Sequence, residues 1–224
     1  MEKFRFDVDA KRWVSALFLR PPTPLACFVF AHGAGAGMGH VFIDKTATAL
    51  FERGIATLRY QFPYMEIGSK RPDHPAIAHA TVRAAVDAAR ERCPNLTLIA
   101  GGKSFGGRMT SQAQAASPLP QVGGLAFFGF PLHAAGKPST ERAAHLFAIA
   151  IPMLFLQGSK DKLAEPAVIR NVTQKLGARA TLHMVDEADH SFHVPKRSGQ
   201  TDEGVINEIT AVVVDWLTAT LMRQ

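Results

Sequence analysis

The chain has 224 residues, of which 47% are hydrophobic and 20% charged, and its formal net charge is +6. This composition predicts a folded protein with a single domain over residues 1–224, and it excludes a disordered chain. The longest apolar runs, 25–31 and 122–130, are far shorter than the roughly 20 residues of a membrane span, so we expect no membrane association. Lys and Arg are scattered along the chain, which argues against nucleic-acid binding despite the basic charge.

Strand and helix patterns alternate along most of the chain. Residues 3–9 and 12–20 predict an antiparallel hairpin. Further strands are predicted at 25–31, 55–62, 96–102, 125–130, 152–158 and 180–185, and helices at 39–53, 75–92, 106–117, 139–149, 166–176 and around 206–216. This order predicts an α/β fold with a mostly parallel central sheet, an N-terminal antiparallel hairpin and helices on both faces. In such sheets, sites form at the carboxyl ends of strands.

One predicted strand runs into Gly102-Lys103-Ser104-Phe105-Gly106, a G-x-S-x-G pattern that precedes a predicted helix. Holding a serine hydroxyl clear of the sheet at such a break requires a strained backbone, and side chains at the flanking positions would clash. We expect Gly102 and Gly106 to face each other closely for this reason. Ser104 is therefore predicted to be a nucleophile; the alternative is a structural turn that contains a serine by chance.

A second strand end, after 25–31, carries a loop with three glycines at 32–37. In this position a loop supplies the second N–H of an oxyanion hole, the first coming from the residue after the nucleophile. This assigns the two N–H groups to Phe105 and Ala34. A flexible surface loop is the alternative, whereas a phosphate cradle would need a G-K-[ST] ending that is missing.

Two more strand ends provide an acid and a base. Asp161 follows the strand at 152–158, and His190 lies on the loop before the last helix. The order of serine, aspartate and histidine is that of a hydrolase triad, in which the carboxylate orients the imidazole. Asp186 and Asp189 are rival acids, although Asp189 is adjacent to His190 and poorly placed to reach its ring.

The chain resembles the α/β-hydrolase superfamily, and in particular the cap-less, dienelactone-hydrolase-related branch that includes testis-expressed protein 30 and the third subunit of the nonspecific-lethal chromatin complex. The stretches that carry this resemblance are AHGAGAG (31–37), RYQFPYMEIG (59–68), GGKSFGGR (101–108), GFPLHAAGKP (129–138), LFLQGSKD (154–161) and ADHSFHV (188–194). By position the resemblance places the nucleophile on Ser104, the acid on Asp161 and the base on His190. Dienelactone hydrolases carry a cysteine nucleophile, so their substrate is not transferred.

Other polar residues of these stretches are expected near the site. Lys103 is predicted to be either exposed beside the nucleophile or in a local salt bridge. His133 either lines the pocket or faces solvent. The remaining candidates, expected to support the site more than to touch substrate, are His32, Gly33, Arg59, Tyr64, Glu66 and Arg108.

The predicted chemistry is acyl transfer to water, with a small-molecule ester-type substrate and no metal or organic cofactor. Only about 20 residues separate the strands at 125–130 and 152–158, which is too few for a cap domain, so we expect small or moderately sized esters, thioesters or lactones. The alternative is a non-catalytic binding or scaffold protein that retains the fold. We expect a cytoplasmic location from the absence of a signal-like apolar segment in MEKFRFDVDAKRW. The sequence does not indicate which oligomeric state the protein has.

Overall fold

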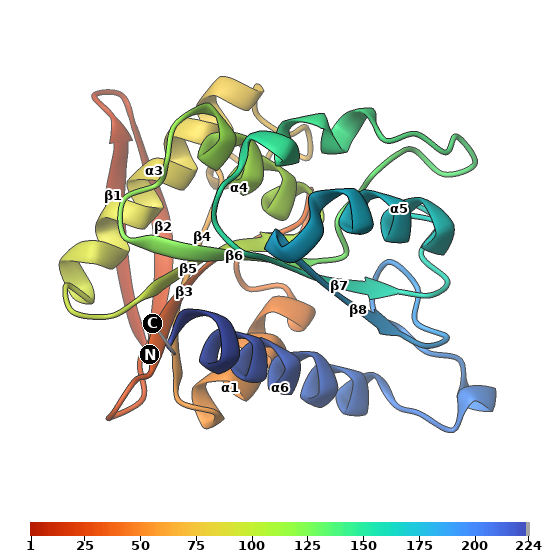
Figure 1. The fold of residues 1–224 in the computed structure, drawn as a ribbon. Helices are drawn as coiled ribbons and strands as arrows, with labels where there is room; N and C mark the ends of the chain where they lie inside the picture. Colours follow the sequence, from red (N-terminus) through yellow and green to blue (C-terminus); the bar gives the residue numbers. More distant parts are fainter. Residues whose placement is uncertain (223–224) are drawn as a thin grey trace.

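A computed structural model describes residues 1–222 and contains an eight-stranded sheet with helices on both faces (Figure 1). The strands are β1 (Glu2–Asp9), β2 (Arg12–Leu19), β3 (Ala26–Ala31), β4 (Ile55–Tyr60), β5 (Leu98–Lys103), β6 (Val122–Phe128), β7 (Met153–Gly158) and β8 (Ala180–Val185). Their order across the sheet is β1-β2-β4-β3-β5-β6-β7-β8. The hairpin β1–β2 and the pair β2–β4 are antiparallel, and every other pair is parallel. The predicted fold class is confirmed.

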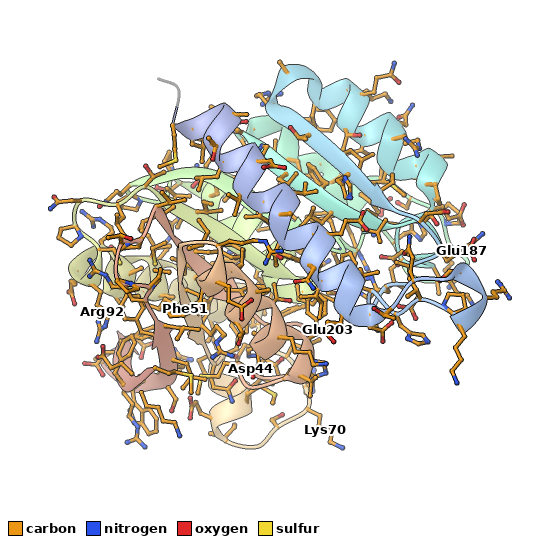
Figure 2. The ribbon with its side chains drawn as sticks, turned by 90° about the horizontal axis from the view of Figure 1, so that it is seen from below. Asp44, Phe51, Lys70, Arg92, Glu187 and Glu203 are labelled. Atoms are coloured by element: carbon orange, nitrogen blue, oxygen red, sulfur yellow. The ribbon has the colours of Figure 1, made fainter. Side chains whose placement is uncertain are left out.

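The helices form two layers. They are α1 (Val41–Glu52), α2 (Pro63–Glu66), α3 (Pro75–Arg92), α4 (Phe105–Ala116), α5 (Pro166–Leu176) and α6 (Asp202–Leu221), with 3-10 turns η1 (Glu141–Ala148), η2 (Gly177–Arg179) and η3 (Lys196–Ser198). Helices α3, α4 and α5 cover one face of the sheet and α1 and α6 the other (Figure 1). Figure 2 views the second face, with Asp44 and Phe51 on α1 and Glu203 on α6.

The strands at the centre of the sheet have no solvent-facing side. Every residue of β3, β4 and β7 is buried, because helices pack on both faces, and this explains their continuous apolar sequences. Two hydrophobic clusters result, one on each side of the sheet. The edge strand β1 differs, since its residues alternate between half-buried and exposed.

Helix α6 has the length and composition of a membrane-crossing helix, with a mean hydropathy of 1.3 over its apolar window. Its apolar stripe nevertheless packs against the sheet: Ile209, Val213 and Leu217 are fully buried, and Trp216 is 5% exposed. The sequence spacing that predicted one buried stripe therefore describes a core helix.

Two local features differ from the sequence predictions. The strand predicted at 55–62 ends at Tyr60, because Pro63 opens the short helix α2, which the sequence analysis did not foresee. The helix predicted at 139–149 is the 3-10 segment η1, with an otherwise irregular connection between β6 and β7. Within the described residues, η1 is the one helical segment of this connection.

Candidate active site

Ser104 lies at a sharp break between β5 and α4. Its backbone has φ 49° and ψ −112°, a conformation that L-residues seldom adopt, so the strained backbone expected at this position is present. Ser104 is the N-cap of α4, and its own side chain makes no capping bond to that helix. The hydroxyl is thereby left free for contacts outside the helix.

Close approach of β3 explains the glycines on either side of Ser104. A Cβ on Gly102 would lie 2.2 Å from the carbonyl oxygen of Ala31, and one on Gly106 would lie 2.5 Å from that of His32. Both glycines face the end of β3, and their absent side chains allow the elbow to pack against it. The neighbouring strand therefore requires glycine at both positions.

Ser104, His190 and Asp161 form a continuous hydrogen-bonded chain. His190 Nε2 is 2.8 Å from Ser104 Oγ, and His190 Nδ1 is 2.7 Å from Asp161 Oδ2. The Asp161 side chain is fully buried, and its carboxylate also accepts hydrogen bonds from the Leu163 N–H and the Gln157 amide. Residues 86 positions apart in sequence are thus brought into direct contact.

The rival carboxylates bind elsewhere. Asp189 Oδ1 accepts the N–H groups of Ser191 and His193, at 2.7 and 3.0 Å, and so shapes the loop that carries His190. Asp186 accepts a hydrogen bond from the Ser159 hydroxyl. Among these three acids, the structure brings Asp161 to the imidazole.

The glycine loop lies over the nucleophile. A Cβ on Gly33 would be 3.9 Å from the Ser104 Cβ. The Ala34 and Phe105 N–H groups make no hydrogen bond within residues 1–222, whereas the next N–H, that of Gly35, donates to the Tyr64 hydroxyl at 3.0 Å. Phe105 follows Ser104 and Ala34 follows Gly33, so both unused donors are available to stabilise an oxyanion.

His32 is buried beneath this loop. Its Nδ1 is 2.7 Å from the Gly33 carbonyl oxygen, and its Nε2 accepts the Phe62 N–H at 3.2 Å. Both bonds are satisfied by the neutral ring with its proton on Nδ1. Burial lowers the pKa of His32 to about 4, so the ring is neutral at physiological pH. His32 therefore holds the loop and makes no contact with the Ser104 hydroxyl.

Lys103 contradicts both sequence expectations, since it is neither exposed nor in a salt bridge. Its Nζ donates to the carbonyl oxygen of His190 and lies 5.8 and 5.2 Å from the ring centroids of Phe42 and Phe192. Burial lowers the pKa of Lys103 to about 8, opposed by the charges of Asp161 and Asp189. Lys103, the last residue of β5, therefore anchors the loop that carries His190.

The other candidate residues contact the protein itself. Glu66 accepts the Ser15 N–H at 2.6 Å, and Arg59, which is 1% exposed, pairs with Asp44 at 2.7 Å. His133 is 2% exposed, which excludes a solvent-facing side chain, and its Nε2 accepts the Glu165 N–H.

Arg108 lies one turn into α4, where its N–H donates to the Ser104 carbonyl. Burial, and then the charge of Arg142, lower the pKa of its guanidinium. The bonds that hold Asp161 and His190 in place, from Gln157 and Lys103, had no signal in the sequence, because no motif marks a donor that acts across the fold.

Residues 24–218 match the family described as alpha/beta hydrolase domain. The chain belongs to this family. Its fold is similar to that of a Coxiella burnetii alpha-beta serine hydrolase homologue, with a TM-score of 0.76 at 19% identity over 96% of this chain and 97% of that one. A Xanthomonas campestris serine hydrolase described as lacking a lid gives a TM-score of 0.76 at 22% identity, over 98% and 96% of the two chains.

A dienelactone hydrolase from Anabaena variabilis has a TM-score of 0.77 at 17% identity over 98% of each chain. At these identities the structures show a shared alpha/beta hydrolase fold. In this member of the family the connection between β6 and β7 is short, with η1 as its helical segment.

Proposed function

We propose that the protein is a serine hydrolase that cleaves carboxylic esters, thioesters or lactones through an acyl-enzyme. The observation that carries the proposal is the chain of two hydrogen bonds, 2.8 and 2.7 Å long, from Ser104 through His190 to Asp161. Such a chain allows the imidazole to take the serine proton while the carboxylate stabilises the resulting cation.

In this mechanism Ser104 Oγ attacks the carbonyl carbon and His190 receives the proton. The Ala34 and Phe105 N–H groups stabilise the negative charge on the carbonyl oxygen. His190 then protonates the leaving group, and in the second half it deprotonates the water that releases the acyl group. Asp161 accepts the hydrogen bond from the Nδ1–H of His190 throughout the reaction. Besides the substrate and this water, the steps require no metal or organic cofactor.

The open carboxyl edge of the sheet supports small or moderately sized substrates. In the described part of the chain, the connection between β6 and β7 contains η1 as its one helical segment, which is too short for a cap domain that would enclose a long acyl chain. The closer resemblance to testis-expressed protein 30 and its chromatin-complex relative remains part of the proposal, resting on the stretches around Ser104, Asp161 and His190.

Hydrolysis of a p-nitrophenyl ester series from acetate to octanoate, by the wild type and by Ser104→Ala, tests the proposal. We expect wild-type turnover, loss of at least about 10³-fold in the variant with its fold intact, and labelling of the wild type alone by a fluorophosphonate probe. The chain-length preference then measures the acyl site. A folded wild type that neither turns over any ester nor reacts with the probe would contradict the proposal and favour a binding protein.

A further inference from the structure

Strand β1 presents a free edge to solvent. It pairs with β2 alone and forms one margin of the sheet (Figure 1). Ser15 of β2, which lies opposite Arg5, directs its N–H to Glu66 and receives the Gln61 N–H on its carbonyl, both away from β1. Residues opposite each other in an antiparallel pair point their backbone groups either toward or away from one another together. The N–H and C=O of Arg5 therefore point outward.

Alternation along the strand extends this result. Lys3 and Asp7, two residues to either side of Arg5, also direct their backbone groups to the free edge, whereas Phe4 and Phe6 direct theirs to β2. To form backbone hydrogen bonds at this edge, an added strand must place residues with outward-pointing backbone groups opposite Lys3, Arg5 and Asp7. This condition limits the registers in which an added strand can bond.

The side chains of β1 carry a polar pattern along one face. Lys3, Arg5, Asp7 and Asp9 are all exposed, with the basic pair in the first half of the strand and the acidic pair in the second. The other face carries Phe4, Phe6 and Val8, which are half-buried. In an antiparallel copy of the strand the acidic half lies opposite the basic half of the first, so the charges of the two exposed faces are complementary.

This reversal makes the strand complementary to a second copy of itself. In an antiparallel pair with Phe6 on the two-fold axis, Arg5 lies opposite Asp7 of the partner subunit, and both are outward-pointing residues. Beyond Asp7 the pairing of β1 with β2 shifts at a β-bulge, so the regular alternation ends there. Shifting the register by two residues along either strand places Arg5 opposite its own copy, or Asp7 opposite its own copy. Like charges directly opposite each other are destabilising, so charge selects the register centred on Phe6.

We propose that the protein forms a two-fold symmetric dimer in which β1 pairs with β1 of a second copy, so that one continuous sheet runs through both subunits. Phe6 then meets Phe6 of the partner subunit on the opposite face. A groove of about 670 Å³ runs along Phe6 and Val8 on this face, and α3 lines it with Ala80 and Ala84 and with charged side chains that include Asp87 and Glu91.

Existing contacts of the charged side chains are compatible with this pairing. The Arg5 guanidinium lies 4.0 Å from the ring centroid of Trp13, and Asp9 pairs with Arg12 at 2.7 Å. Both contacts are at the surface, where such pairs contribute little to stability. Strands β1 and β2 also precede residue 24, where the match to the family begins, so the proposed interface lies on a part of this chain outside the matched segment.

Charge reversal at two positions tests the dimer. Arg5→Asp leaves two acids opposite each other, and Asp7→Arg leaves two bases, so each variant alone should dimerise roughly 10- to 100-fold more weakly than the wild type. Mixed together, the two variants again place unlike charges opposite each other and should form a heterodimer. The double variant Arg5→Asp/Asp7→Arg should recover the homodimer. Light scattering coupled to size exclusion measures mass, and circular dichroism checks the fold.

Hydrogen exchange gives a second readout. The Arg5 and Asp7 amides should exchange slowly in the dimer and rapidly in either single variant. A wild type that is monomeric at every concentration overturns the proposal, and so does a dimer that both single reversals leave intact, or a mixture of folded variants that fails to associate. A heterodimer formed only on mixing supports it.

Discussion

The nucleophile elbow and the two loops that carry Asp161 and His190 are held in place by different physics. At the elbow, backbone atoms of β3 approach so closely that a Cβ on Gly102 would lie 2.2 Å from a carbonyl oxygen. The loops are held by hydrogen bonds, which include distant side-chain donors: Gln157 to Asp161 and Lys103 to the His190 carbonyl. A close backbone contact requires glycine and can therefore be recognised in the local sequence, whereas a hydrogen-bond donor that is distant in sequence cannot.

The largest effect is expected at the acid. Asp161→Asn preserves the shape of the side chain but favours the wrong tautomer of His190, so kcat should fall by about 10⁴-fold. Asp186→Asn is the matched control, because Asp186 accepts a hydrogen bond from the Ser159 hydroxyl and makes none with the imidazole. Ester hydrolysis measures both variants. Equal losses in the two would show that the hydrogen-bonded chain does not define the acid.

The elbow is tested by adding one methyl group. Gly102→Ala places a Cβ against the backbone of Ala31, which has no freedom to withdraw from the centre of the sheet, and should lower the free energy of unfolding by at least about 3 kcal/mol. Gly39→Ala is the control, since a Cβ there has nothing within 4 Å. Urea denaturation distinguishes them. A Gly102 variant as stable as the Gly39 variant would contradict the close approach.

Lys103 connects the nucleophile elbow to the loop that carries His190, so its substitution measures how much one polar contact stabilises that loop. Lys103→Met removes the charged donor to the His190 carbonyl and should lower the free energy of unfolding by about 1.5–3 kcal/mol. Lys160→Met is a suitable control, because Lys160 makes an exposed ion pair with Glu187 that should contribute less than about 1 kcal/mol. If both substitutions lower the melting temperature equally, Lys103 does not anchor the loop.

The smallest effect depends on pH. His32 has a pKa of about 4 in the folded protein and about 6.5 when unfolded, so the unfolded chain binds the extra proton between these values. Stability conferred by neutral His32 is therefore complete above pH 6.5 and is lost as pH falls toward 4, by about 2 kcal/mol at pH 5. The stability difference between wild type and His32→Asn, from denaturation at pH 7 and pH 5, should shrink by this amount. A difference that stays constant would mean that His32 titrates normally.

The sequence predicted the sheet, its hairpin and the residues that follow each strand, because burial on two faces and glycines at close contacts are local signals. It did not predict α2, whose Tyr64 hydroxyl accepts the Gly35 N–H, or the role of Lys103. These features depend on which segments meet in space, and contacts of that kind have no period or motif in one chain.

The backbone of Ser104 has a consequence for how the protein can change over evolutionary time. A non-glycine residue at φ 49° and ψ −112° carries strain of about 1–3 kcal/mol, which glycine would relieve. Under the proposed function, the one substitution that removes the nucleophile most completely also makes the fold more stable. A lineage released from selection for hydrolysis would therefore be drawn toward glycine here, and a serine at this position is maintained against the preference of the fold.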